Sequence, residues 1–310
     1  MKSYIGKRLL SLIPILIGIT FLTFLLLYIA PGDPAQKRLS SNSGVAVTQE
    51  QIDNMREEMG LNRPFLVQYG SWLGKALTGD LGTSYKDSMP VSGKLGPAFQ
   101  RTLILAGASL LISLLVSIPT GILSAVYRGS FWDHLFRLLS FVGNSLPNFL
   151  LSILLMYFLC IKVDLFPVIA TGSVQGLFLP ALALGIPMAS RFVRQIRAEV
   201  LEEIGRDYVT GLTARGVRSS WVLFRNVLRN AMSSIMTIIA LAVGTLMGGS
   251  VVVESIFNWP GVGKLAMDSI TARDYPVIQG FVLIMAVVYV LVNLFTDLFH
   301  HWLDPRVELE

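Results

Sequence analysis

The sequence predicts an all-helical membrane protein that crosses the bilayer six times and carries a small helical extracytoplasmic subdomain after its first transmembrane helix. Three observations lead to this fold class. The 310 residues are 53% hydrophobic and only 15% charged, whereas about 25% of an ordinary soluble domain is charged. Six long segments contain no Asp, Glu, Lys or Arg, and arginines gather in two of the loops between them.

Each of the six segments can cross a bilayer as a helix. A span needs about 20 mainly apolar residues, because hydrocarbon offers no water to pair with backbone N–H and C=O groups. One charge at the bilayer centre costs about 2.5–3.5 kcal/mol on insertion scales, so the absence of charge indicates selection by lipid. The segments are Leu9–Ala30, Thr102–Tyr127, Leu138–Ile161, Gly176–Ser190, Ala231–Val253 and Val277–Thr296.

The first segment follows Lys2, Lys7 and Arg8, so a cleaved signal peptide is an alternative to a permanent anchor. Its apolar run exceeds the about 7–15 residues of a signal-peptide core. We therefore expect residues 1–30 to form an N-terminal transmembrane anchor helix.

The fourth segment is the shortest and contains Pro180 and Pro187. We expect it to continue into the amphipathic stretch that follows, where Arg191, Arg194 and Arg197 recur along one helical face.

The basic residues of the short loops set the expected orientation. Arg128 and Arg137 lie between spans two and three, and eight arginines lie in residues 191–230 between spans four and five. Because cytoplasmic loops carry an excess of Lys and Arg, both loops and both termini are expected in the cytoplasm. The net charge of +5 therefore indicates membrane orientation rather than binding to nucleic acid.

Residues 31–101, on the expected outer side, are predicted to form a small, partly helical subdomain. Thr48 and Gln51 fit a helix start with a capping box. Two apolar stripes at helical spacing follow, and the subdomain either caps the helix bundle or receives something from outside. The stripes are Ile52, Met55 and Met59, then Phe65, Tyr69, Trp72, Leu73 and Leu77.

Sequence patterns argue against an enzyme. Gly261–Leu265 half-resembles a phosphate-binding loop, but Asn258 and Leu265 stand where such a loop needs Gly and Ser or Thr. The one Cys and three His have no zinc-site or catalytic spacing. We expect no catalytic residues, no metal ligands and no cofactor bound by this chain.

A proton-coupled secondary transporter would need an ionisable group in a span, and Glu254 at the outer end of span five is the nearest candidate. We interpret Glu254 as a solvated helix terminus. An ion channel is the remaining alternative. Gly244 and Gly248 have the spacing of close helix contacts, so span five should face another helix, within this chain or across a dimer.

The cytoplasmic segment 191–230 is the strongest functional feature. Gly205 breaks its first helix, Asp207 is a suitable N-cap and Gly216 a suitable C′ residue, so Tyr208–Arg215 should form an isolated two-turn helix. Such a short helix is marginal alone and needs a docking surface. Tyr208, Val209 and Leu212 would form its docking face against a soluble partner.

Motifs along nearly the whole chain resemble the dipeptide, oligopeptide and nickel permeases of binding-protein-dependent ABC importers. The segment 207–231 resembles the cytoplasmic coupling loop of that family, although Thr210-Gly211-Leu212 stand where the consensus has Glu-Ala-Ala. The other motifs are Ala30-Pro31-Gly32-Asp33-Pro34, Gly60-Leu61-Asn62-Arg63-Pro64, Gly79-Asp80-Leu81-Gly82, Phe257-Asn258-Trp259-Pro260-Gly261-Val262-Gly263, Asp274-Tyr275-Pro276 and Leu303-Asp304-Pro305-Arg306.

The resemblance implies a permease subunit in a bacterial inner membrane, with residues 102–300 as the core transmembrane domain and 301–310 as a cytoplasmic tail. Its implied partners are membrane lipid, a second homologous permease, two cytoplasmic ATPases that bind ATP and Mg²⁺, and an extracytoplasmic solute-binding protein. ATP-driven closure of the ATPases would rock the spans by alternating access. The implied coupling residues are Asp207, Tyr208, Val209, Thr210, Gly211, Leu212, Ala214, Arg215 and Gly216, and the implied outer gate loop holds Trp259, Pro260, Gly261, Gly263, Asp274, Tyr275 and Pro276.

The resemblance is nearest to nickel-system permeases, so nickel is the expected solute. No His stands in the expected outward half, and imidazole is the usual nickel ligand, which favours a chelated metal over a bare ion. Dipeptide or oligopeptide import by the same mechanism is the alternative.

The expected topology can be tested with reporter fusions. Fusions after Lys86 and after Lys264 should report the outer side, and a fusion after Arg218 should report the cytoplasm, because the arginine-rich loops are retained inside. A cytoplasmic signal at Lys86 would contradict the six-span arrangement.

Overall fold

The computed structural model describes residues 2–43, 47–170 and 172–303. Within these ranges the chain is helical, and its only bridge of β type is an isolated pair between Thr83 and Pro90. The chain divides into two compact units. One comprises Met1–Arg101 and Gly261–Leu291, and the other Thr102–Pro260 and Val292–Glu310.

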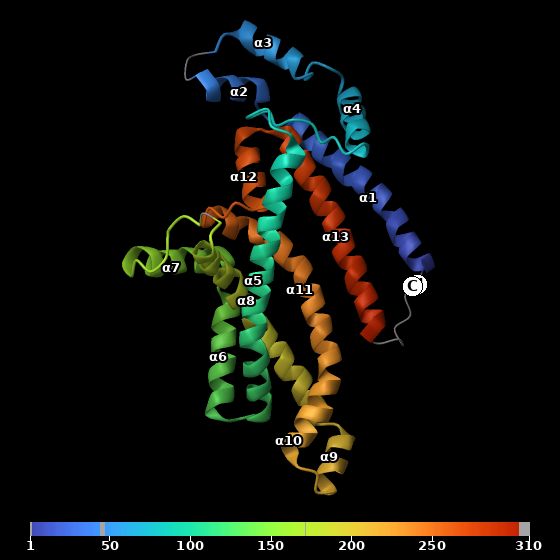
Figure 1. The fold of residues 1–310 in the computed structure, drawn as a ribbon, viewed down its shortest axis with the longest axis vertical. Coiled ribbons are helices and arrows are strands. Elements are labelled where there is room, and N and C mark those ends of the chain that lie inside the picture. The colour runs from blue at the N-terminus through green and yellow to red at the C-terminus, as the bar shows by residue number, and fades with distance from the viewer. Residues whose placement is uncertain (1, 44–46, 171, 304–310) are drawn as a thin grey trace. The chain divides into compact units, whose positions relative to one another are not determined.

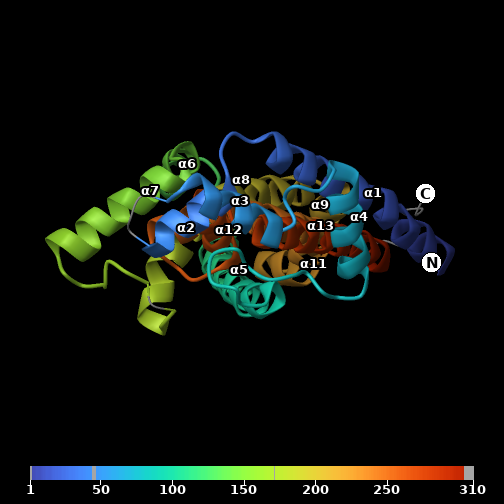
Figure 2. The ribbon, with the colours of Figure 1, turned by 90° about the horizontal axis from the view of Figure 1, so that it is seen from above.

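The first unit contains one complete long apolar helix, parts of two other long helices and a set of short ones (Figure 2). Its helices are α1 (Lys2–Ile29), α2 (Pro34–Ser43), α3 (Gln49–Glu58), α4 (Phe65–Leu77) and α12 (Val262–Ala272), with the first part of α5 (Val91–Val126) and most of α13 (Tyr275–Leu303). The predicted capping box at Thr48 and Gln51 is confirmed. Residues 31–101 thus carry three short helices.

Aromatic side chains join α4 to α1. Phe21 and Phe24 of α1 meet Phe65 and Tyr69 of α4 edge to face, with ring centroids 5.3–5.6 Å apart. The first two members of the stripe that predicted α4, Phe65 and Tyr69, therefore pack on α1. Its last member does not follow, because Leu77 is 81% exposed.

The second unit contains the remaining helices (Figure 1). They are the rest of α5, α6 (Phe131–Ser145), α7 (Asn148–Leu155), the π-helix η1 (Met156–Lys162), α8 (Val174–Ile204), α9 (Asp207–Ala214), α10 (Ser219–Val222), the π-helix η2 (Leu223–Val227) and α11 (Leu228–Ile256). Buried residues of α5, α8 and α11, among them Phe192, Ile196 and Ile235, form its core.

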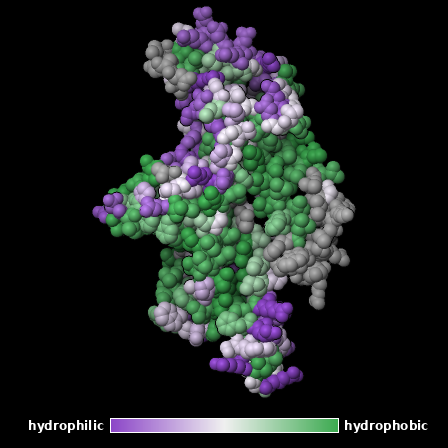
Figure 3. All heavy atoms as spheres, viewed as in Figure 1, coloured by the Kyte–Doolittle hydropathy of each residue, from purple (hydrophilic) through white to green (hydrophobic). Residues whose placement is uncertain are grey.

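Four described helices are long and apolar enough to cross a membrane, and a bent pair of helices raises the number to five. The four lie at Leu10–Ile29, Val91–Val126, Val174–Ile204 and Tyr275–Thr296. Figure 3 shows hydrophobic residues over much of the visible helix surface. Six spans remain a prediction. The fourth expected segment does continue through its arginine stretch, because α8 is one helix of 31 residues.

The third expected span, Leu138–Ile161, is wrong as a continuous helix. The described chain bends by 100° between Phe131–Ser145 and Asn148–Lys162. Leu146 has extended backbone angles (φ −82°, ψ 122°), because the ring of Pro147 disfavours helical geometry in the residue before it. A hydropathy pattern does not detect this break, because Leu146 and Pro147 are both uncharged and do not interrupt the apolar run.

The terminal motif Leu303-Asp304-Pro305-Arg306 and the expected tail 301–310 fall largely outside the described residues, of which Leu303 is the last.

Candidate coupling site

The short helix α9 begins and ends close to where the sequence predicts. Its first residue is Asp207, and Arg206 is the N-cap, with extended angles (φ −76°, ψ 149°) and no side-chain cap hydrogen bond. The prediction of Asp207 as N-cap is therefore wrong by one position. The Asp207 carboxylate lies in the first turn, where the positive end of the helix dipole favours it.

The predicted stop at Gly216 is confirmed. Gly216 has φ +78°, a left-handed backbone conformation that residues other than glycine rarely adopt. Its N–H donates to the carbonyl of Thr213 (3.0 Å), and the N–H of Val217 donates to the carbonyl of Leu212 (3.2 Å). This pair of bonds is a Schellman motif, which satisfies carbonyls that the helix end would otherwise leave unpaired.

A buried carboxylate anchors α9 to its neighbours. Glu203, near the end of α8, is 6% exposed. Its Oε1 accepts hydrogen bonds from the Tyr208 hydroxyl (2.8 Å) and the Asn230 amide (2.9 Å), and its Oε2 accepts one from Arg206 Nε (2.9 Å). Burial, followed by the hydrogen bond to Glu203, raises the pKa of Tyr208, which keeps the phenol protonated as a donor. One side chain thus joins α8, α9 and α11.

The apolar side of α9 also faces its own chain. Val209, Leu212 and Val217 are partly buried and pack against the core of the second unit. The predicted docking face of Tyr208, Val209 and Leu212 is therefore wrong, because these side chains hold α9 to the rest of the second unit. The helix is too short to be stable alone, and its support comes from within the chain.

The exposed face of α9 is formed by small and polar residues. Asp207, Thr210, Gly211 and Ala214 are all exposed, and their spacing of i, i+3, i+4 and i+7 places them on one side of the helix. We call these four residues the α9 outer face. Arg215 and Gly216 extend it at the helix end and are also exposed. Figure 1 shows α9 and α10 beside the first turns of α11.

The expected outer gate residues fall in two units. Trp259 and Pro260 belong to the second unit, where Trp259 is 1% exposed and its backbone N–H donates to the backbone carbonyl of Glu254 (2.8 Å). Glu254 is fully buried, and Thr102 Oγ1 donates to its Oε1 (2.7 Å). The interpretation of Glu254 as a solvated helix terminus is therefore wrong. A buried carboxylate is tolerated when such donors meet it.

The other gate residues lie in the first unit, around the start of α12 and of α13. Gly261 is the N-cap of α12, with Gly263 in its first turn. Asp274 is 1% exposed and accepts hydrogen bonds from the Ser84 hydroxyl and from the N–H of Tyr85 (2.8 Å). Burial and then the charge of Asp274 raise the pKa of Tyr85 to about 12. Asp274 thus fixes the loop before α5 to the start of α13.

The neighbouring Arg273 joins a second motif to the same place. It adopts a left-handed conformation (φ +57°) at the end of α12, and its guanidinium donates to the carbonyl of Pro31. Gly32 has φ +104°, and a side chain there would collide with the same guanidinium. Two sequence motifs far apart in the chain therefore meet within the first unit.

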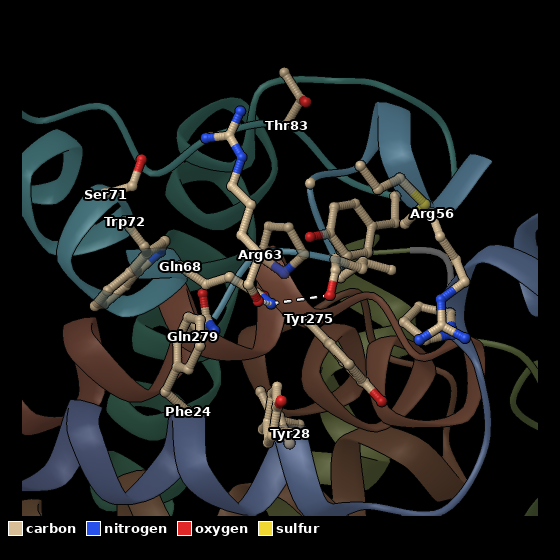
Figure 4. Close-up of a pocket in the computed structure, with 18 of the residues that line it drawn as sticks. Phe24, Tyr28, Arg56, Arg63, Gln68, Ser71, Trp72, Thr83, Tyr275 and Gln279 are labelled. Atoms are coloured by element: carbon tan, nitrogen blue, oxygen red, sulfur yellow. Dashed lines mark hydrogen bonds between the residues drawn. The ribbon is translucent and has the colours of Figure 1, made fainter. Parts of the chain in front are cut away.

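A cavity of about 940 Å³ opens in the first unit beside these motifs. Figure 4 shows Phe24 and Tyr28 of α1, Trp72 and Gln68 of α4, and Tyr275 and Gln279 of α13 around it. Four basic side chains (Arg38, Arg56, Arg63 and Lys75) and four acidic ones (Asp33, Glu57, Glu58 and Asp80) line it. Its walls are therefore aromatic and charge-balanced.

Sequence reasoning missed the two residues that anchor α9. Asn230 was visible as part of the coupling-loop motif, but its contact with Glu203 joins positions 27 residues apart. Glu203 lies close to Glu199 and Glu202 in the sequence, and nothing in the sequence indicated which of the three carboxylates would be buried. No group of three or more His, Cys, Asp or Glu residues in the described ranges is arranged to hold a metal ion.

Two family models together match most of the chain. The model of the family described as "Binding-protein-dependent transport system inner membrane component" matches residues 117–309, and the model of the N-terminal part of such membrane components matches residues 1–106.

Relatives match over the whole chain. A putative peptide permease protein of Brucella suis biovar 1 is 39% identical, with 100% of both chains covered. The metal-staphylopine import system permease protein of Staphylococcus aureus is 36% identical over 99% of this chain and 98% of its own. A solved structure of the inward-facing MetNI methionine ABC transporter covers 68% of this chain and 96% of its own, with TM-score 0.54 and 19% identity, a likeness of fold.

The left-handed stop of α9 can be tested with two matched substitutions. Gly216→Ala should destabilise the end of α9, because a Cβ in the left-handed region costs about 1–2 kcal/mol. Gly211 lies in the same helix without a positive φ and has open space around an added Cβ, so Gly211→Ala should not destabilise the helix end. Hydrogen exchange of the purified chain should be faster over 207–217 in Gly216→Ala alone. Equal exchange in both variants would contradict the assigned role of Gly216.

Proposed function

The chain belongs to the family of binding-protein-dependent transport system inner membrane components, and we propose that α9 is the helix through which its partner ATPases drive transport. The protein is a multi-pass permease subunit of an ABC importer. In the proposed complex a second homologous permease completes the pathway, two cytoplasmic ATPases bind and hydrolyse ATP, and an extracytoplasmic binding protein delivers the solute. This chain itself carries out no catalysis.

The anchoring of α9 by Glu203 is the observation that carries the proposal. A helix that receives force from a partner must transmit it to the helices of its own chain. Hydrogen bonds and the packing of Val209 and Leu212 join α9 to α8 and α11. Its opposite side, the α9 outer face, is exposed. A push on that face would therefore move α8 and α11 with it. Such rigid-body movement of packed helices is a common way to switch between two states.

The α9 outer face suits insertion into a cleft. Its central residues, Thr210, Gly211 and Ala214, are small, so a partner surface can approach the helix backbone closely. Asp207 and Arg215 place opposite charges at the two ends of the helix. Charges of this kind fix the orientation of a partner more than they add affinity.

The first unit is the part proposed to meet the solute-binding protein, since residues 31–101 are expected outside. Asp274 and Arg273 hold Tyr85 and Pro31 in place there. Gate residues Trp259 and Pro260 follow α11 directly, so movement of α11 is the proposed link between α9 and the outer gate.

We propose nickel, carried as a complex, as the solute. The lack of His in the expected outward segments supports a chelated metal, and the staphylococcal relative is named for import of a metal–staphylopine complex. Short peptides are the second candidate, because the Brucella relative is named a putative peptide permease.

Cysteine crosslinking tests the coupling role. Thr210→Cys and Ala214→Cys should crosslink to the ATPase in the assembled, active complex, with yields that change when ATP binds, because both residues lie on the exposed face. Val209→Cys and Leu212→Cys are the matched controls, and they should react poorly because their side chains pack inward. No crosslink from any position between 207 and 216 would remove α9 from the coupling mechanism.

Uptake by reconstituted vesicles, with the partner subunits and binding protein present, separates the two solutes. ATP-dependent uptake of radioactive nickel should require an added chelator and should resist competition by excess dipeptide. Strong competition by dipeptides, with no uptake of the chelated metal, would assign the protein to peptide import. Uptake of bare nickel would contradict transport as a complex.

A further inference from the structure

A groove between α6 and α8 in the second unit has features of a binding site that the transport mechanism does not use. The two helices pack side by side, and the groove has a volume of about 510 Å³. A smaller hollow of about 400 Å³ continues it toward Arg128 and Gly129. The groove is lined by His134, Arg137, Leu138 and Phe141 of α6 and by Arg194 and Arg197 of α8.

The sequence spacing explains why these residues meet. The four residues of α6 follow the pattern i, i+3, i+4 and i+7, and the two arginines of α8 are three apart, so each set lies on one helical face. Both helices approach closely at Gly143, where a Cβ would lie 2.2 Å from Ser190 Oγ. The faces are therefore held opposite one another by helix packing.

The groove carries an excess of positive charge. Asp133 is 1% exposed and is bound by Arg197 through two hydrogen bonds of 2.8 and 2.9 Å, so these two charges offset each other. Arg137 and Arg194 are exposed and form no ion pair with the described residues. No acidic side chain lies in the lining of the groove, which favours an anionic ligand.

The part of the groove next to the arginines is lined by apolar side chains. Leu138 and Phe141 are 59% and 64% exposed, and the adjacent Leu139 and Val142 are 57% and 48% exposed. These four residues belong to α6, which together with the following segment Asn148–Lys162 is apolar enough to enter a membrane. An occupant would therefore contact cations at one end and hydrocarbon along the other.

We propose that this groove binds an anionic phospholipid of the surrounding bilayer, with its phosphate between Arg137 and Arg194 and an acyl chain along Leu138 and Phe141. Guanidinium groups bind phosphate oxygens through paired hydrogen bonds, and basic pockets between membrane helices bind anionic headgroups. A free phosphate would satisfy the arginines but leave the apolar wall exposed. The lipid site rests on the membrane placement of the proposed permease and not on the role of α9.

Lipid titration of the purified full-length chain, followed by native mass spectrometry, tests the site. Phosphatidylglycerol should bind and phosphatidylcholine should be at least tenfold weaker. Arg137→Gln combined with Arg194→Gln should weaken phosphatidylglycerol binding about tenfold or more, because each basic residue near an anionic headgroup contributes substantially to binding.

The matched control combines Arg225→Gln with Arg229→Gln, which removes the same charge from exposed arginines outside the groove and should leave binding within about twofold. Equal loss in both pairs, or equal binding of the two lipids, would overturn the proposal. Inorganic phosphate at millimolar concentration should not displace the lipid, and displacement would assign the groove to a soluble phosphate compound. Displacement by the partner ATPase would make it a protein interface instead.

A second measurement avoids dependence on the folding of the variants. Photoactivatable phosphatidylglycerol, added to the unmodified chain, should label peptides of α6 and α8 that contain Arg137 and Arg194. Labelling confined to other helices would overturn the proposal. The measurement needs no ATPase, so its failure would leave the coupling role of α9 untouched.

Discussion

The carboxylate of Glu203 is the group on which the arrangement of the proposed coupling segment depends. A buried ionised carboxylate is costly unless hydrogen-bond donors surround it, and here the donors come from Tyr208, Asn230 and Arg206. These residues lie before, within and after α9. The cost of burying one charge therefore forces three separate segments into a single arrangement, and α9 cannot shift without moving the ends of α8 and α11 or breaking these bonds.

The ends of α9 could be predicted from the sequence because they are local. Gly216 ends α9 through the left-handed backbone conformation of its own position, which needs no distant partner. The orientation of α9 could not be predicted in the same way. Tyr208, Val209 and Leu212 have the apolar character of a docking face, but a sequence does not say whether such a face meets a partner or the protein's own core. Asn230 and the core of the second unit decide that question.

Two further errors have the same physical origin. Hydropathy predicted one span across Leu146 and Pro147, whereas the backbone restriction that proline imposes bends the chain there. The position of Glu254 at the end of a predicted span suggested a solvated helix terminus, whereas Thr102, 152 residues away, supplies a donor that allows its burial. The polar network around Asp274 was likewise only partly visible, since the motif containing Asp274 was recognised without any indication that its carboxylate meets Ser84 and Tyr85.

If α9 couples transport to the ATPases as proposed, its geometry accounts for coupling without the acidic residue of the consensus. Thr210 stands where that residue is expected, and it lies on the exposed face. The charges that remain are Asp207 and Arg215, at opposite ends of the helix and with a small, neutral surface between them. A cleft with charges of the reverse order would accept α9 in one direction only, and close contact with the small residues would transmit force through van der Waals contact. Orientation and force transmission are then separate properties of one face, so the loss of a central charge need not remove either.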